Sequence, residues 1–325
     1  MDIILPVAGL GTRLRPQTWS KPKPLVSVGG KPMLAHVLDR VLPVNPEKLV
    51  FITGYRGDQI EEWARANYDQ ELVFVDQPQM LGQTDAIIRT RDDVKGDALI
   101  LFPDMIFEAD FTHLASVDAD VVAYTKEVED PSAFGIAVLE DDRIVKLVEK
   151  PKDPLSNLAL IGVYYFKHMP DLYQAMDEQM DRGMTLKNEY FLADAVQLMI
   201  DHGAKAITAP VSVWEDCGNA EALLSTNRYL LDHRVKAHTS TYDSATIVQP
   251  SVIAPDAVIE RAVVGPYASI GSGVTIRDAV VRDAIVDDGS TIESAVIHHS
   301  VIGKNAEITG RAHELNVGDT AVIDL

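Results

Sequence analysis

The chain has 325 residues, which is enough for one large domain or two of ordinary size. Its net charge of -20 argues against nucleic acid as a partner, because phosphate contacts require a broad basic face. No run approaches the roughly 18 apolar residues needed to cross a bilayer, and the first residues read as a strand, so we expect neither a membrane partner nor a signal peptide. The single cysteine, Cys217, forms no intramolecular disulfide, which favours a cytoplasmic protein.

Residues 1–235 alternate strand-like apolar runs with helix-like runs. The predicted strands are Ile3–Val7, Lys48–Thr53, Leu72–Asp76, Ala98–Phe102 and Val121–Thr125. Helices are predicted at Pro32–Leu42 and Gln59–Tyr68, and a later helix is predicted to be capped by Asn188 and to end at Gly203. Such alternation is typical of βαβ units, so we expect an α/β domain with a mixed, mainly parallel, Rossmann-like sheet.

The pattern changes after His238. An aliphatic residue then recurs every five or six positions, at Ile247, Ile253, Ile259, Val264, Ile270, Ile276, Val281, Val286, Ile292, Ile297, Ile302 and Ile308. A period near six indicates a parallel β-helix, in which about twelve short strands would form roughly four coils. We predict this domain over residues 247–325, with a polar linker at 236–246 and a cap at Arg311–Leu325; a small open β domain is the alternative.

The segment after the first predicted strand carries the strongest functional signal. Residues 9–24 read Gly-Leu-Gly-Thr-Arg-Leu-Arg-Pro-Gln-Thr-Trp-Ser-Lys-Pro-Lys-Pro, with four cations and no acid. Small residues let backbone amides approach a phosphate chain, and local cations reverse the field of an acidic protein. Leu14 stands where a dinucleotide fingerprint needs its third glycine, and the Gly-Lys-Ser/Thr ending of a phosphate-binding loop is absent. The glycine pair alone is equally consistent with a tight turn.

The whole stretch, continued by Pro-Lys-Pro-Leu and Lys31-Pro32, resembles the signature of the sugar-1-phosphate nucleotidylyltransferases, which make nucleotide-sugars. The resemblance implies that Arg13 and Lys23 are catalytic and lie against the triphosphate and the sugar phosphate. It places the nucleotide against the backbone of four residues: Ala8, Gly9, Gly11 and Thr12. Longer members of the family, like some glucose-1-phosphate thymidylyltransferases, carry a C-terminal left-handed β-helix of hexapeptide repeats.

Two carboxylates indicate a metal site by the same resemblance. Asp104 follows the strand Ala98–Phe102, at the edge where α/β sheets bind ligands, and Asp216 lies just before Cys217. Either alone is more typical of a helix cap or a turn. Together they match the family pair that holds Mg²⁺. The family usually has glycine before the first of them, whereas this chain has Pro103.

Gln77 is the candidate reader of the base. A glutamine amide offers a donor and an acceptor, which match the carbonyl and the N3–H of uracil or thymine. In thymidylyl and uridylyl relatives a glutamine five residues before a glycine, here Gly82, reads the base, whereas guanylyl relatives tend to carry Glu. An exposed amide at a strand end is the alternative. Thr84 and Asp85 depart from the family pattern, which leaves contacts from this turn open.

The resemblance assigns five positions to the sugar phosphate: Gly135, Glu149, Lys150, Gly162 and Glu189. A carboxylate such as Glu149 can accept hydrogen bonds from two vicinal hydroxyls. The alternatives are an exposed Glu149–Lys150 pair and, for Glu189, a first-turn charge that favours its helix dipole.

The remaining reactive side chains are interpreted as structural. His298 and His299 form a pair on the solenoid, a fold that also occurs in acyltransferases with a histidine base, but we expect two corner side chains that face solvent. Cys217 is expected to be a small buried residue without thiolate character, because a neighbouring carboxylate disfavours the thiolate.

We therefore expect a nucleotidyltransferase with Mg²⁺ as cofactor, which moves a nucleoside monophosphate from a triphosphate to a sugar 1-phosphate and releases pyrophosphate. Either dTTP or UTP with glucose 1-phosphate is the leading substrate pair, and mannose-1-phosphate guanylyl transfer is the alternative. A bifunctional acyltransferase and a non-catalytic subunit that binds nucleotide-sugar are alternatives of another class. The partners are then small molecules, and the flat solenoid faces predict a homo-oligomer whose copy number stays open.

Overall fold

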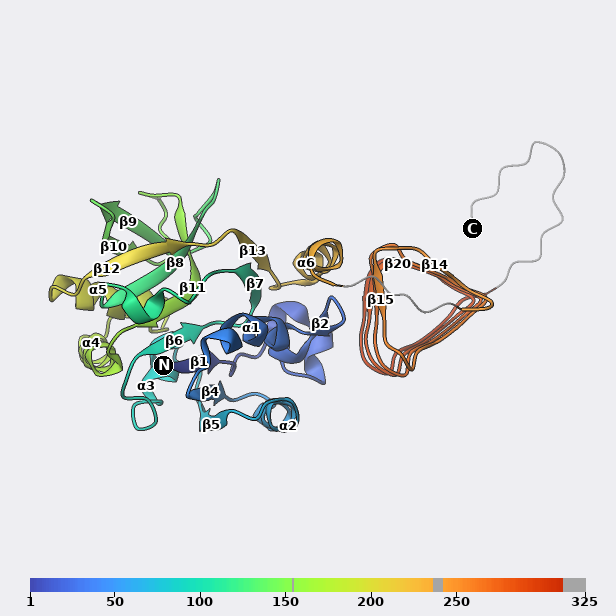
Figure 1. The fold of residues 1–325 in the computed structure, drawn as a ribbon, viewed down its shortest axis with the longest axis horizontal. Helices are drawn as coiled ribbons and strands as arrows, with labels where there is room; N and C mark the ends of the chain where they lie inside the picture. Colours follow the sequence, from blue (N-terminus) through green and yellow to red (C-terminus); the bar gives the residue numbers. More distant parts are fainter. Residues whose placement is uncertain (154, 236–241, 312–325) are drawn as a thin grey trace. The chain divides into compact units, whose positions relative to one another are not determined.

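The computed structural model describes residues 1–153, 155–235 and 242–311. The chain divides into two compact units. The first unit comprises Met1–Val26 and Lys31–Leu223, and the second comprises Ser27–Gly30 and Leu224–Leu325. Figure 1 shows a sheet with helices in the first unit and a triangular coil of strands in the second. No helix among the described residues is both long enough and apolar enough to span a membrane.

The first unit is built on a 9-stranded sheet in the order β5-β4-β1-β6-β11-β8-β12-β10-β9. Its strands are β1 Asp2–Pro6, β4 Lys48–Thr53, β5 Glu71–Asp76, β6 Ala98–Leu101, β8 Val121–Glu127, β9 Ile136–Glu140, β10 Arg143–Val148, β11 Leu158–Phe166 and β12 Ala206–Pro210. β5, β4, β1 and β6 run parallel, whereas β11 runs antiparallel to both β6 and β8. All of the strands predicted from the sequence form, and the mixed α/β architecture is confirmed.

Both faces of this sheet are covered, because alternate residues of β1 join different cores. Ile3 packs in one core with Leu34 of α1, and Ile4 packs in another with Leu192 of α5. Successive side chains of a strand point to opposite faces, so an uninterrupted apolar run serves both layers. The helices of this unit are α1 Met33–Val41, α2 Gly57–Asn67, α3 Gln83–Ile88, α4 Met169–Asp181 and α5 Leu192–Asp201.

The start of α5 corrects one prediction. Asn188 does not cap the helix, because Lys187 and Asn188 have φ angles of 54° and 64° and form a turn. Leu186 and Glu189 close that turn by exchanging backbone hydrogen bonds of 3.0 and 3.1 Å. The helix begins only at Leu192, so Glu189 is not a first-turn charge. The predicted end at Gly203 holds, since its amide donates to Ile200 O at 2.9 Å.

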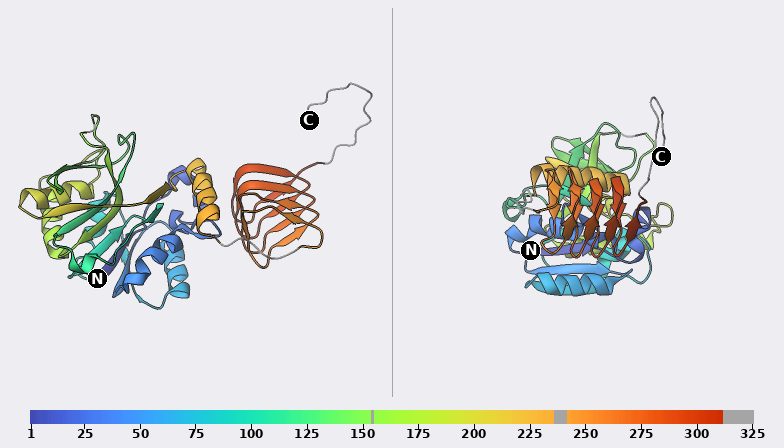
Figure 2. Two further views of the ribbon diagram at one scale, coloured as in Figure 1. Left: turned by 45° about the horizontal axis from the view of Figure 1, so that its top comes forward. Right: turned by 90° about the vertical axis from the view of Figure 1, so that its right-hand side faces the viewer.

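The second unit contains the predicted β-helix. Its strands are β14 Thr246–Ile247, β15 Ser251–Ile253, β16 Val258–Glu260, β17 Val263–Val264, β18 Ala268–Ile270, β19 Thr275–Arg277, β20 Val280–Val286, β21 Thr291–Glu293, β22 Val296–Ile302 and β23 Glu307–Thr309. They pair in parallel from coil to coil, and the coils stack as Figure 2 shows. One ladder runs through four levels, from Thr246 to Val263, Val280 and Val296.

The periodic aliphatic residues fill the inside of this coil. Eight of them are at most 4% exposed: Ile253, Ile259, Val264, Ile270, Ile276, Val281, Val286 and Ile292. Most of the predicted cap, residues 312–325, and residues 236–241 of the predicted linker lie outside the described residues.

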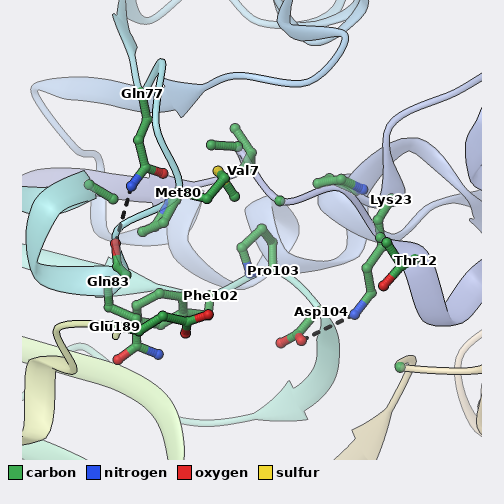
Figure 3. A pocket seen from close by; sticks show the side chains of 18 of the residues that line it. Val7, Thr12, Lys23, Gln77, Met80, Gln83, Phe102, Pro103, Asp104 and Glu189 are labelled. Atoms are coloured by element: carbon green, nitrogen blue, oxygen red, sulfur yellow. Dashed lines mark hydrogen bonds and ion pairs between the residues drawn. The ribbon is translucent and has the colours of Figure 1, made fainter. Parts of the chain in front are cut away.

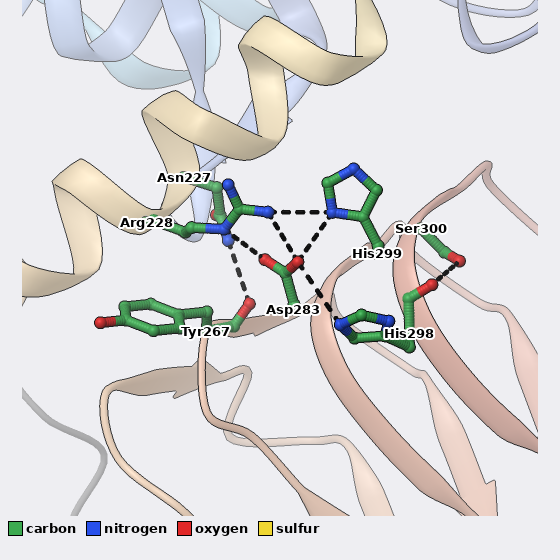
Figure 4. Close-up of polar contacts among 7 residues, drawn as sticks. All are labelled: Asn227, Arg228, Tyr267, Asp283, His298, His299 and Ser300. Atoms are coloured by element: carbon green, nitrogen blue, oxygen red, sulfur yellow. Dashed lines mark hydrogen bonds and ion pairs between the residues drawn. The ribbon is translucent and has the colours of Figure 1, made fainter.

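The last helix, α6 Ala220–His233, contacts the coil through polar side chains, which Figure 4 shows. Arg228 donates two hydrogen bonds of 2.7 Å to the carboxylate of Asp283. His299 Nδ1 lies 2.8 Å from the same carboxylate. The side chains of His298 and His299 are both exposed, as expected, and each also lies within 4.0 Å of the Asp283 carboxylate. In addition, Ser269 Oγ donates a hydrogen bond of 2.6 Å to Oδ1 of buried Asn227.

Candidate functional site

The first unit contains a cavity of about 430 Å³ whose walls include the residues that follow β1 and β6 (Figure 3). These two strands are parallel neighbours in the sheet, so the chain leaves both of them at the same edge. Ligands of open α/β sheets bind at this edge, beyond the carboxyl ends of the strands. Val7 and Ala8 extend from β1, and Phe102, Pro103 and Asp104 extend from β6.

The glycine-rich loop forms one wall of the cavity. Gly11 has a φ of 61°, and a Cβ atom there would lie 2.8 Å from Cβ of Lys23. Only glycine accommodates both the left-handed backbone and this close approach. Thr18 Oγ1 donates a hydrogen bond of 2.8 Å to Gly11 O, which holds the backbone of the loop in this position. Six residues singled out in the sequence line the cavity from this region: Ala8, Gly9, Gly11, Thr12, Arg13 and Lys23.

A two-stranded ribbon brings the two candidate metal ligands to one place. β7 Met105–Glu108 pairs antiparallel with β13 Val213–Asp216, and Asp216 stands opposite Met105. The Cys217 amide then donates to Asp104 O at 3.1 Å. Asp104 and Asp216 therefore flank the same end of the ribbon, although only Asp104 is part of the cavity wall.

Cations lie beside both carboxylates. Lys23 Nζ is 3.1 Å from Asp104 Oδ2, a contact that Figure 3 shows across the cavity. On the other side, a Cβ atom at Gly218 would lie 2.9 Å from Asp216 Oδ1 and 3.3 Å from Nη1 of Arg13. Glycine at this position thus leaves room for the carboxylate and the guanidinium to approach each other. Cys217, which separates Asp216 from Gly218 in the sequence, is fully buried, as expected.

The donor set fits Mg²⁺ but does not enclose it. Carboxylate oxygens are the ligands that this ion prefers, and it is usually bound through one or two carboxylates together with phosphate oxygens. Among the described residues, no group of three or more His, Cys, Asp or Glu side chains could hold a metal. Asp104 and Asp216 would therefore need oxygens from a bound phosphate to complete a coordination shell.

Gln77 and Gly82 lie in the opposite wall of the cavity. Gln77 follows β5 and is 5% exposed, so the alternative of an exposed amide is wrong. Its Nε2 donates to Gly82 O at 3.1 Å and to Asp85 Oδ2 at 2.9 Å. At Gly82 a Cβ atom would lie 2.5 Å from the backbone of Tyr190, which excludes any larger residue. Thr84 turns away from the cavity and bonds Gln179 at 2.8 Å.

Only some of the five candidate sugar-binding residues belong to the cavity wall. Lys150 and Glu189 line the cavity, whereas Gly135, Glu149 and Gly162 do not. Glu149 Oε1 is 3.1 Å from Lys150 Nζ, and a Cβ atom at Gly135 would lie 2.9 Å from Oε2 of Glu149. Because Glu149 is packed against Gly135 and its side chain is only 14% exposed, it is not part of a solvated surface pair.

Gly162 supports the wall from behind. Its φ is 77°, and a Cβ atom there would contact Cβ of Phe102 at 3.4 Å. Phe102, whose amide donates to Gly162 O at 3.0 Å, lines the cavity.

Two ionisable groups near Glu149 have raised pKa values. Burial raises the pKa of Asp194, in the first turn of α5, and the charge of Glu149 raises it further. Burial likewise raises the pKa of Tyr164, with the same carboxylate as the second cause. Both shifts have the same physical sense, because burial and the charge of Glu149 disfavour a second negative charge beside it.

Several wall residues were not identified from the sequence. Met80 and Gln83 flank Gly82, and Phe191 precedes α5. The proximity of Met80 and Gln83 to the Gln77 motif was a usable signal. Phe191 had none, because it reaches the cavity through tertiary contacts, among them the bond from Leu192 N to Gln83 Oε1 at 3.1 Å.

Comparisons with known proteins agree on one family. The family model described as "Nucleotidyl transferase" matches residues 2–233. The UTP–glucose-1-phosphate uridylyltransferase AglF of Haloferax volcanii is 31% identical over 236 residues, which cover 68% of this chain and 93% of that protein. The glucose-1-phosphate thymidylyltransferase of Streptomyces antibioticus is 27% identical, over 100% of this chain and 99% of that protein.

Other similar proteins share less of their length with this chain. The bifunctional protein GlmU of Methanocaldococcus jannaschii is 31% identical over 71% of this chain but only 55% of its own length. The chain likewise covers 62% of the GlmU of Methanococcus maripaludis. A solved structure of UDP-glucose pyrophosphorylase complexed with UDP-glucose has a TM-score of 0.63 and 23% identity, over 72% of this chain and 99% of that one. That likeness establishes the shared fold.

Proposed function

Because this chain belongs to the nucleotidyl transferase family, we propose that it transfers a nucleoside monophosphate from a nucleoside triphosphate to a sugar 1-phosphate and releases pyrophosphate. UTP or dTTP is the nucleotide and glucose 1-phosphate the acceptor, so that the product is UDP-glucose or dTDP-glucose. The names of the Haloferax volcanii and Streptomyces antibioticus relatives support these substrates.

The observation that carries the proposal is the meeting of Arg13, Lys23 and Asp104 in one cavity wall. In this reaction a phosphate oxygen of the sugar attacks the α-phosphorus, and pyrophosphate leaves. The attacking group is already an anion, so the reaction needs relief of charge repulsion more than a strong base. Fixed cations stabilise the charge that grows on the leaving pyrophosphate, and they do so without reorganisation at the moment of reaction.

Asp104 and Asp216 would hold Mg²⁺, which when bound neutralises negative charge on the phosphates. Lys23 contacts the Asp104 carboxylate, so the same lysine can orient that carboxylate and approach a phosphate. Gly135 and Glu149 would bind sugar hydroxyls, with Lys150 at the sugar phosphate. Glu189 and the backbone at Gly162 complete this half of the site.

The base is assigned to Gln77 and Gly82. Gln77 offers an uncharged amide, which suits the edge of uracil or thymine. A guanylyl transferase tends to carry Glu at this position, so mannose-1-phosphate guanylyl transfer is the less favoured reaction. Purified protein should release pyrophosphate with UTP or dTTP and glucose 1-phosphate, and more slowly with GTP, ATP or mannose 1-phosphate.

The assay has two results that would overturn the proposal. A strong preference for GTP would remove the assigned role of Gln77. Tight binding of a nucleotide-sugar without any turnover would make the chain a binding subunit instead of an enzyme. A parallel arm with acetyl-CoA and amino-sugar phosphates tests the alternative of acyl transfer by the β-helix.

A further inference from the structure

Asp85 lies directly behind the candidate base reader and has no role in the reaction described above. It belongs to α3 and is 3% exposed. Its Oδ2 accepts the hydrogen bond from Gln77 Nε2 at 2.9 Å. Asp85 is therefore in a position to act on the nucleotide through Gln77 without touching it.

The two groups around the Gln77 amide fix its orientation. Gly82 O and the Asp85 carboxylate both lie within 3.1 Å of Nε2. A carbonyl and a carboxylate can only accept hydrogen bonds, so the NH₂ group must face them. Rotation of the amide by a half-turn would bring its oxygen against two acceptors. In Figure 3 the nitrogen of the labelled Gln77 amide makes the dashed hydrogen bond, and the amide oxygen is turned away from that bond.

Arg89 in turn holds Asp85. Arg89 Nη2 donates to Asp85 Oδ1 at 2.9 Å, and Nε approaches Oδ2 at 3.4 Å, one helical turn along the chain. The Arg89 side chain is 32% exposed and that of Asp85 is 5% exposed, so Arg89 lies on the solvent side of the pair and Asp85 on the inner side. Among the described residues, no donor bonds the Gln77 amide oxygen, which leaves this acceptor for a ligand in the cavity.

We propose that Asp85 is a positioning residue that sets base specificity by locking Gln77 with its acceptor toward the nucleotide. The proposal rests on the proposed function, in which Gln77 reads the base. A fixed acceptor selects bases that present an N–H at that point. Uracil and thymine carry N3–H, whereas N3 of cytosine is an acceptor and would face the Gln77 oxygen without a hydrogen bond. Because uracil and cytosine have the same size, cavity shape alone does not separate them.

The test compares UTP with CTP in the wild type and in Asp85→Asn. Asparagine keeps the size of the side chain but can turn its NH₂ toward Gln77, which allows the Gln77 amide to rotate. The ratio of kcat/KM for UTP over CTP should fall about tenfold or more, the scale of one misplaced hydrogen bond. Both nucleotides are measured on one preparation, so the ratio is independent of the folded fraction. Asp92→Asn is the matched control, because its side chain is 98% exposed.

A second variant covers the case in which Asp85→Asn does not fold. Arg89→Met keeps the Asp85 carboxylate but removes the group that holds it, so the UTP/CTP ratio should fall in the same direction by a smaller factor. A UTP/CTP ratio that stays unchanged in these variants would overturn the proposal. If activity also falls equally with both nucleotides, the role of Asp85 is purely structural.

Binding separates this inference from the proposed function. Calorimetric titration with UTP and CTP reports base selectivity whether or not the chain transfers the nucleotide. If the wild type binds UTP over CTP without turnover and Asp85→Asn loses that preference, the proposed function fails and the role of Asp85 stands. If the wild type turns over UTP and the variants keep its selectivity, only the role of Asp85 fails.

Discussion

Lys23 links the glycine-rich loop to the metal-binding edge of the cavity. Its ammonium group contacts Asp104, and its Cβ packs against Gly11. We expect Lys23→Met to lower kcat by about two to three orders of magnitude, because one fixed charge in the site is lost. Steady-state pyrophosphate release measures the effect. Lys21→Met, in the same segment, should keep near-normal turnover; equal losses in both variants would mean that charge in the loop acts only at long range.

Gly11 allows a second prediction with a control in the same loop. Gly11→Ala places a methyl group on a left-handed residue and against the Lys23 side chain, so the free energy of unfolding should fall by about 1–2 kcal/mol. Gly9 has no positive φ, and no heavy atom lies within 4 Å of the place its methyl group would take, so Gly9→Ala should change stability little. Chemical denaturation of the two variants gives the comparison. Equal stability would show that the loop can rearrange.

Single residues show what the sequence can and cannot reveal about the site. The glycine-rich loop could be identified because its constraints are local, as with the left-handed backbone of Gly11. Asp85 was only a departure from a family pattern. Its pairing with Arg89 is a local contact one helical turn apart, but its role depends on Gln77, which meets it from the end of β5, and no local pattern encodes that second contact.

At the scale of elements, α6 and the coil share a charged contact that predicts a pH dependence. Hydrogen bonds from Arg228 hold the pKa of Asp283 below its usual value, with a smaller contribution from His299, while burial acts in the opposite direction. A carboxyl whose folded pKa is depressed stabilises the fold above its unfolded pKa of about 3.9, and this contribution is lost as pH falls through the folded pKa.

The groups that face Asp283 are Arg228 from α6 and His298 and His299 from β22. Asp283→Asn should therefore lower the Tm at about pH 5, and the difference from the wild type should shrink toward about pH 3 as the wild-type carboxyl is protonated. Thermal unfolding followed by circular dichroism measures both. A difference that stays constant over this range would mean that the contact contributes through packing instead of charge.

The elements were predicted unevenly, for a physical reason. β4 and α1 follow from strong apolar patterns of a strand and a helix, and the coil follows from its repeat. The start of α5 was misplaced because Asn188 resembles a cap, whereas it adopts a left-handed turn closed by Leu186 and Glu189. The ribbon of β7 and β13 was missed because two short strands of distant sequence carry no signal until they pair.

For the whole molecule, the charge of -20 predicts a dependence of stability on salt. Like charges repel in the compact state, and salt screens this repulsion over a length that falls from about 30 Å at 0.01 M to about 3 Å at 1 M. The Tm should therefore rise as NaCl is added at neutral pH. Near the pI of about 4.7 the net charge vanishes and the rise should be much smaller. A similar rise at both pH values would assign the effect to the salting-out of apolar surface.

The acidic composition of the chain and the cationic wall of the cavity have opposite effects on an anionic substrate. Two cations of the segment 9–24, Arg13 and Lys23, line the cavity, whereas the chain as a whole has a large excess of acids. A local group of fixed charges can reverse the field within one pocket while the net charge of the molecule keeps the opposite sign. Attraction of phosphate groups is thus confined to the place where the proposed reaction needs it.

Successive coils of this unit differ in length by one residue without disturbing its interior. The pairing steps from Ser251 to Ala268 in one coil but from Thr275 to Thr291 in a later one, which is one residue shorter. The difference lies at a corner, because three residues separate Val264 from Ala268 whereas two separate Val281 from Ala284, and all four of these side chains stay buried. A shift within a strand would point its inward side chains outward, so single-residue insertions and deletions should be tolerated at the corners and not in the strands.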